Sequence, residues 1–149
     1  MRACIVSIAD TEEMARTLDR YLRCFLADRI ESYFMTYGQR LLSGSLFRQT
    51  DLFILELLRR DDIGYRAEAI PVAGKWCSAG KRVLIISAAV EADIVNNPSY
   101  WDLAAPEALH ERVQQLLDSP PAADRDFSRL KEVFKEYCRP AVDYHRAKP

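Results

Sequence analysis

Apolar runs of strand length recur along the chain and alternate with segments of helical periodicity. Most of the runs are continuously apolar, which is typical of strands buried on both faces of a parallel sheet. The alternation of strand and helix predicts an α/β protein with a doubly wound parallel sheet that carries helices on both faces. The five predicted strands cover residues 3–9, 30–37, 51–58, 83–88 and 100–103.

The segments between the strands carry the helical signals. After the first strand, Thr11 is placed to cap a helix, and Met14, Leu18 and Leu22 recur at helical spacing. Pro71 would kink the third helix or begin it, because proline lacks the amide proton that a helix interior needs. The five predicted helices cover residues 11–26, 39–47, 65–79, 90–97 and 106–117.

A proline-containing linker interrupts the pattern near the C-terminus. We therefore predict a folded domain over residues 1–118, a linker over 119–123 and a helical extension over 124–149. The extension carries an apolar stripe, which an isolated helix of this length would not keep exposed to water. We favour docking of the stripe on a second chain or an output domain, since five helices already suffice to cover the sheet. The stripe consists of Phe127, Leu130, Val133, Phe134 and Tyr137.

Bulk composition limits the classes of function. The 149 residues suit one domain, and the net charge of −1 gives no electrostatic reason to expect binding to nucleic acid or to an anionic membrane. The four cysteines include no CxxC pair, so neither a zinc site nor a dithiol motif is indicated. The sequence shows neither a signal-peptide pattern nor an apolar span of about 18 residues, so we expect a cytoplasmic location.

Several motifs between residues 3 and 117 stand in the order and spacing of one known family. The segments IVSIAD at residues 5–10 and DLFILE at residues 51–56 are apolar runs that end in an acid. Gly64 follows position 56 by eight residues, and the pair Ser87-Ala88 closes the fourth strand. These motifs resemble a response-regulator receiver domain, in which a glycine stands eight residues after the phosphate-accepting aspartate. The resemblance implies a five-stranded, flavodoxin-like receiver fold with an extra C-terminal helix.

The departures from that family concentrate at its chemistry. Glu56 stands in the place of the accepting aspartate and is one methylene longer. Asp10 is the one acid left where the family carries two magnesium ligands, with Ala9 in the other place. Either Asp102 or Leu103 falls where the family carries a lysine. Because phosphoryl transfer needs a carboxylate, a divalent cation and fixed positive charge, the resemblance implies a degenerate receiver that is not an enzyme.

The positions that survive from the family's site are Asp10, Ser87 and the switch aromatic Tyr100. Glu56 either imitates a phosphorylated aspartate, which would bias the domain toward one signalling state, or is a solvated residue at a strand end. Asp10 is either a weak Mg²⁺ ligand or a carboxylate at the entry of a helix. Ser87 is either a switch hydroxyl or a strand-end hydroxyl bonded to backbone.

The resemblance implies a regulatory module of signal transduction that works through protein–protein contact. Expected partners are a sensor kinase, another regulator or output domain, or a second copy in a homodimer. The alternative is a phosphoacceptor regulator with an atypical Mg²⁺ site, and a third reading is a domain that binds another small ligand. In the family, the fourth helix, fifth strand and fifth helix carry partner contacts. Here that surface would include Trp101, His110, Arg112 and Gln114.

Overall fold

The computed structural model describes most of the predicted domain. The described residues are 2–37, 43–56, 58–59, 64–65, 69–87, 100–102 and 109–121. The predicted helix at 90–97 and the extension at 124–149, with its apolar stripe, lie outside them. Within the described residues, no helix combines the length and the apolar character that spanning a membrane requires.

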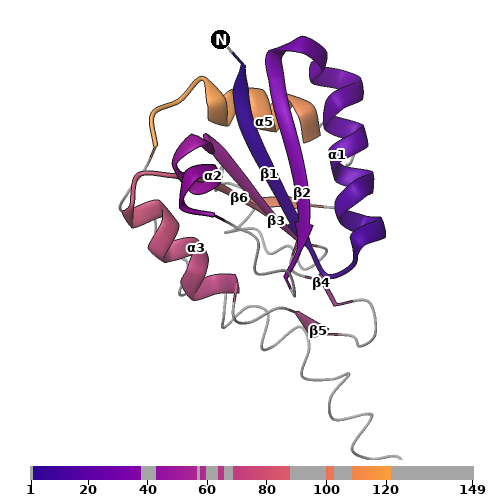
Figure 1. The fold of residues 1–149 in the computed structure, drawn as a ribbon. Helices are drawn as coiled ribbons and strands as arrows, with labels where there is room; N and C mark the ends of the chain where they lie inside the picture. The colour runs from indigo at the N-terminus through magenta and orange to yellow at the C-terminus, as the bar shows by residue number, and fades with distance from the viewer. Residues whose placement is uncertain are drawn as a thin grey trace, which may run out of the picture.

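A parallel sheet forms the centre of the molecule (Figure 1). Its strands stand in the order β2-β1-β3-β6-β7, and every neighbouring pair is parallel. Four of the strands have five or more residues, whereas β7 has three and pairs with the end of β6. The prediction of an α/β protein with a parallel sheet is therefore confirmed. The strand bounds are β1 Ala3–Ala9, β2 Ile30–Thr36, β3 Leu52–Glu56, β6 Arg82–Ser87 and β7 Tyr100–Asp102.

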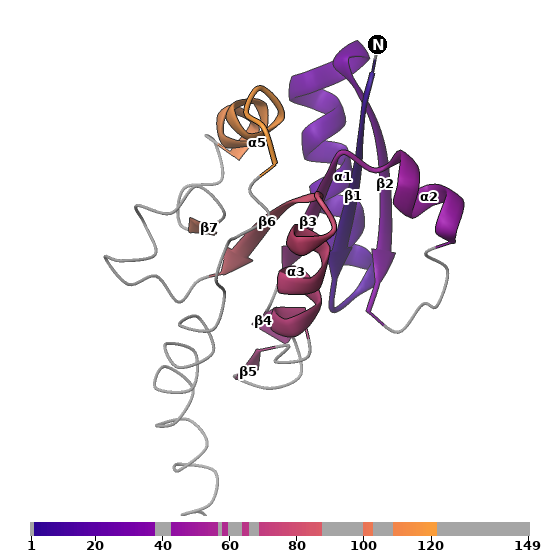
Figure 2. The ribbon, with the colours of Figure 1, turned by 90° about the vertical axis from the view of Figure 1, so that its left-hand side faces the viewer.

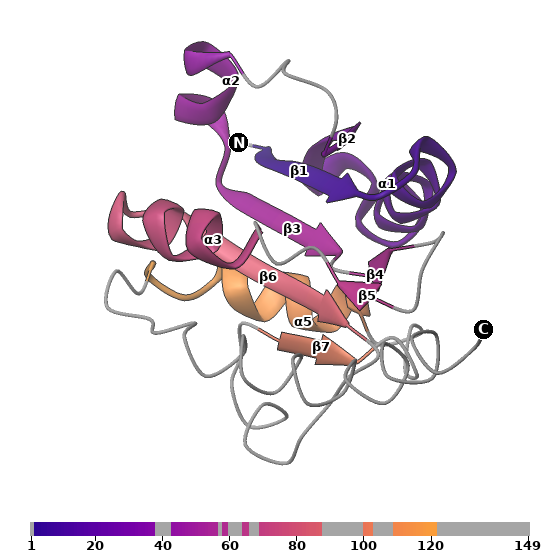
Figure 3. The same ribbon diagram turned by 90° about the horizontal axis from the view of Figure 1, so that it is seen from below.

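Helices cover both faces of the sheet, as the doubly wound pattern predicted. Figure 3 shows α2 and α3 on one side of the strands and α1 on the other. Helix α5 shares the apolar core of α1. In Figure 1, α5 runs across the strands rather than alongside them, and in Figure 2 it is seen nearly end-on. The helix bounds are α1 Glu12–Leu26, the short 3-10 helix η1 Ala27–Arg29, α2 Gly44–Gln49, α3 Ala69–Ser78 and α5 Leu109–Leu117.

Two apolar cores result from the alternation of side chains along the strands. In β1, Val6 and Ile8 pack with Ala73 of α3, whereas Ile5 packs with Leu22 of α1. Both cores are fully shielded at their centres, because Ile5, Val6, Leu22 and Ala73 have no exposed surface. The burial on both faces explains why the strands read as continuous apolar runs.

The start of α1 follows from its sequence. The Thr11 hydroxyl accepts a hydrogen bond from the Met14 amide at 3.2 Å, which satisfies one of the amides that a helix leaves without an internal partner. Glu12 and Glu13 add negative charge to the first turn, where the helix dipole favours it. The predicted cap is confirmed.

Two helices begin later than predicted. For α2, the Ser43 hydroxyl accepts a hydrogen bond from the Leu46 amide at 3.0 Å, so capping at Ser43 places the start after it. For α3, the first residue is Ala69, which puts Pro71 in the first turn. An amide is not needed at that position for the helical hydrogen-bond ladder, so Pro71 does not interrupt the helix.

The predicted third strand is too long. Strand β3 ends at Glu56, and β4 (Leu58–Arg59) pairs antiparallel with β5 (Gly64–Tyr65) instead of extending the main sheet. This small hairpin lies near the carboxyl end of β3 (Figure 3). It separates β3 from the helix that follows and adds an element that the strand–helix pattern did not predict.

Candidate functional site at the carboxyl edge of the sheet

The predicted site positions lie along one edge of the sheet. Asp10 directly follows the last residue of β1, Glu56 is the last residue of β3, and Ser87 is the last residue of β6. Glu56 pairs with Ile86 in register, one residue before Ser87. Parallel strands bring their carboxyl ends to the same edge, which is where ligand sites in doubly wound folds lie. The three positions that the sequence singled out therefore lie at one edge of the sheet.

The point where the winding of the sheet changes direction falls between β1 and β3. Strand β2 lies on one side of β1, and β3 lies on the other. Ile8 of β1 pairs with Leu55 of β3, so Glu56 stands one residue further along that pairing, beside the end of β1. Asp10 and Glu56 thus flank the switch point of the sheet, the usual crevice for a binding site in this class of fold.

Glu56 is buried, which corrects the interpretation of a solvated strand end. The residue is only 1% exposed. The reason is its place in β3, which has β1 on one side, β6 on the other and a helical layer on each face. Glutamate side chains are almost never buried to this degree unless they are paired. Glu56 is the most informative residue of this edge.

Tyr37 connects the ends of three strands. Its amide donates to the Ala9 carbonyl at 3.2 Å, and its hydroxyl donates to the Glu56 carbonyl at 3.0 Å. The side chain therefore reaches from the end of β2, past β1, to the end of β3. Sequence reasoning missed this residue. The available signal was its position as the last residue of a predicted strand that ends at the same edge as the site.

Asp10 lies at the entry of α1, since Thr11 beside it is the helix cap. Among the described residues, no group of three or more His, Cys, Asp or Glu side chains is arranged to hold a metal ion. The role of Asp10 as a Mg²⁺ ligand stays a prediction.

The pairing of β6 with β7 shows which residue of β7 lies at the carboxyl edge. Ser87 pairs with Asp102, and Tyr100 pairs with Ile85, so Asp102 is at the carboxyl edge and Tyr100 is two positions back from it. Of the two residues considered for the family's lysine position, Asp102 is the one level with Ser87. Trp101, the first residue of the predicted interaction surface, lies between them in β7.

Two residues of the predicted interaction surface, His110 and Gln114, make contacts within the chain. The His110 ring stacks on Phe25 of α1 with centroids 4.3 Å apart, and its Nδ1 lies 3.0 Å from the Tyr21 hydroxyl. Gln114 accepts from Arg29 at 3.5 Å. Because α5 crosses the strands, His110 and Gln114 point toward the end of α1, whereas Arg112 between them is half-buried.

Searches against protein-family models and against curated proteins find no match for this chain. The candidate site therefore rests on the geometry of the sheet edge.

Proposed function

We propose that the chain is a regulatory module of signal transduction with a receiver-like, flavodoxin-like fold, and that it acts through protein–protein contact without phosphoryl transfer. One observation carries the proposal. A buried glutamate, Glu56, ends the central strand at the switch point, the place in which a receiver holds its accepting aspartate.

The strand order supports the receiver likeness. With the β4–β5 hairpin set aside, the order β2-β1-β3-β6-β7 is the 2-1-3-4-5 order of flavodoxin-like proteins. The motifs that resemble receiver strands fall on β1, β3 and β6, which are neighbours in this order. Fold alone does not give function, so the proposal depends on the residues at the carboxyl edge.

The same residues argue against phosphorylation. An accepting carboxylate must meet the phosphorus in line, and Glu56 is almost fully buried. The reaction also needs positive charge near the transferred group, whereas the residue level with Ser87 in the register is the acid Asp102.

The alternative is a phosphoacceptor regulator with an atypical Mg²⁺ site. The observation in its favour is that Asp10 and Glu56 flank one switch point, because oxygen ligands from two strand ends are what Mg²⁺ takes. It would still lack the second acid and the lysine of the family.

Incubation with a small-molecule phosphodonor and Mg²⁺ separates the two functions. We expect the intact mass to stay unchanged while an authentic receiver, treated in parallel, gains a phosphoryl group. A stoichiometric gain that disappears in Glu56→Gln would establish the alternative and refute the proposal.

A second experiment tests whether Glu56 affects protein–protein contact. If the charge of Glu56 imitates a phosphoryl group, Glu56→Gln should change self-association or partner binding while the protein stays folded, because the change keeps the shape and removes the charge. Sedimentation of both proteins over a range of concentrations gives the result. Equal association would leave Glu56 as a structural group of the sheet edge.

A further inference from the structure

Three buried polar atoms belong to the interface between α1 and the strands β1 and β2. They are Ser7 Oγ of β1, Ser32 Oγ of β2 and Asp19 Oδ1 of α1, and none has a hydrogen-bond partner in the described part of the chain. Their residues are at most 4% exposed. Buried polar groups in folded proteins nearly always have a partner, from protein or from ordered water, so three exceptions at one interface require an explanation.

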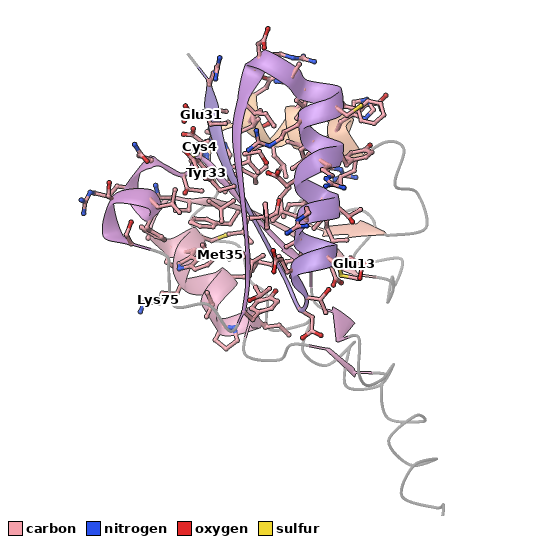
Figure 4. The ribbon with its side chains drawn as sticks, turned by 45° about the vertical axis from the view of Figure 1, so that its right-hand side comes forward. Cys4, Glu13, Glu31, Tyr33, Met35 and Lys75 are labelled. Atoms are coloured by element: carbon pink, nitrogen blue, oxygen red, sulfur yellow. The ribbon has the colours of Figure 1, made fainter. Side chains whose placement is uncertain are left out.

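The sheet register places both hydroxyls on the face that α1 covers. Ile5 pairs with Ser32, and Ser7 pairs with Phe34, so these four residues share one face, on which Ile5 packs under α1. The other face of β2 is distinct, since Glu31, Tyr33 and Met35 project away from α1 (Figure 4). Ser7 and Ser32 are therefore diagonal neighbours beneath one helix.

Arg23 ties Asp19 to the same strand. Its Nε donates to Asp19 Oδ2 at 2.9 Å, and its terminal nitrogen donates to the Ser32 carbonyl oxygen. One guanidinium thus spans the carboxylate and the backbone of Ser32. The two partners differ in exposure, because 60% of the Arg23 side chain is exposed and 6% of the Asp19 side chain is. The second carboxylate oxygen, Oδ1, remains on the buried side of this bridge.

The chemistry of the three atoms selects one ligand. Asp19 Oδ1 accepts hydrogen bonds, whereas each serine hydroxyl both donates and accepts. A cation would be repelled by Arg23 beside it, and an anion by Asp19. Water is neutral, donates and accepts, and commonly completes the bonding of buried polar groups.

We propose that the interface between α1 and the β1–β2 pair is a binding site for buried water, which bridges Asp19 Oδ1 to the hydroxyl of Ser32 and extends to that of Ser7. The proposal is independent of the receiver likeness. With this water in place, the packing of α1 against the sheet is partly polar, because it includes the exposed Arg23 and the buried water.

The test is a high-resolution crystal structure of the full chain, together with water relaxation dispersion of the wild type and Ser32→Val. We expect ordered water within hydrogen-bond distance of Asp19 Oδ1 and Ser32 Oγ, and loss of a long-lived water in Ser32→Val, because valine suits a strand and offers no hydroxyl. Ser45→Ala is the control, since Ser45 is exposed on α2 and should leave the count of long-lived waters unchanged.

Two results would overturn the proposal. One is a crystal structure in which Ser32 Oγ bonds Asp19 Oδ1 directly with no water between them. The other is the same number of long-lived waters in the wild type and in Ser32→Val. Should Ser32→Val fail to fold, the crystal structure of the wild type decides alone.

Discussion

The burial of Glu56 changes what its substitution should do. At 1% exposure, truncation to alanine removes most of a side chain from a packed strand end. We expect Glu56→Ala to lower the free energy of unfolding by about 1–3 kcal/mol, because the shorter side chain leaves a cavity and no longer packs against its neighbours. Urea denaturation measures the change, with Glu13→Ala, an exposed glutamate of α1, as the matched control. Equal stability of Glu56→Ala and wild type would contradict the burial.

Two cysteines near the start of the chain differ in reactivity for a physical reason. Cys4 is buried in β1, and burial first, then the charges of Asp51 and Glu31, raises the pKa of its thiol. Cys24 is exposed on α1. Since the thiolate is the reactive form, we expect alkylation of native protein at neutral pH to label Cys24 about 100-fold faster than Cys4 or more.

Peptide mapping of a Cys138→Ser variant gives the two alkylation rates without a contribution from the last cysteine. Denatured protein is the control, in which both thiols should react alike. Equal rates in the native protein would mean that β1 opens readily.

For single residues, the sequence predicted where a residue lies along its strand better than it predicted the burial and contacts of the side chain. The acids at the ends of two apolar runs marked Asp10 and Glu56, although the predicted third strand continued two residues past Glu56. The burial of Glu56 depends on which strands lie beside β3, and that is a property of strand order rather than of the local sequence. Tyr37 was missed for the same reason, since its bonds to Ala9 and Glu56 reach strands that are remote in sequence.

Among the helices, α1 was predicted best because three independent signals agree: a threonine cap, acids in the first turn and an apolar stripe. The start of α2 was misplaced because the cap at Ser43 outweighs the apolar residues before it. The β4–β5 hairpin has strands of two residues, which are too short to show any periodicity. A helix with a capping residue or a long apolar stripe, such as α1, is thus predictable from the sequence. A very short hairpin, such as β4–β5, is not.

The cap of α1 provides a test at the element scale. Thr11→Ala removes the acceptor of the Met14 amide, so we expect a loss of about 1 kcal/mol in the free energy of unfolding. Thr17→Ala is the matched control, because Thr17 is exposed within the same helix and its hydroxyl donates to the Glu13 carbonyl rather than capping an amide. Chemical denaturation of the three proteins gives the comparison. A larger loss in Thr17→Ala than in Thr11→Ala would contradict the assigned cap.

For the whole molecule, the alternation of strands and helices was enough to predict a parallel sheet with two helical layers. The crossing direction of α5 was not predictable, because it depends on how Leu109, Val113 and Leu116 meet Leu84 and other core residues. In that direction the His110 ring stacks on Phe25 of α1, and Gln114 accepts from Arg29 of η1. The contacts of a helix face are therefore less predictable than the fold that carries the helix.

Truncation after Pro121 tests the predicted extension. The described residues of both apolar cores lie before that point, so we expect the shortened chain to keep its fold by circular dichroism. If the stripe at 124–149 docks on a second chain, light scattering should show an associated full-length protein and a monomeric truncated one. A truncated protein that unfolds, or a full-length chain that is monomeric at high concentration, would instead make the extension part of this domain.

The bridge from Arg23 to β2 has a further consequence for behaviour at high concentration. The Tyr37 amide faces β1, and backbone groups alternate in direction along a strand, so the Ser32 carbonyl faces the opposite side, where β2 is the last strand of the described sheet. Exposed strand margins invite pairing with other copies of a chain and so promote aggregation, and natural proteins block them with charged side chains. Arg23 donates a hydrogen bond to the Ser32 carbonyl. This carbonyl is then not available to a strand of another copy, so Arg23 should disfavour aggregation through β2.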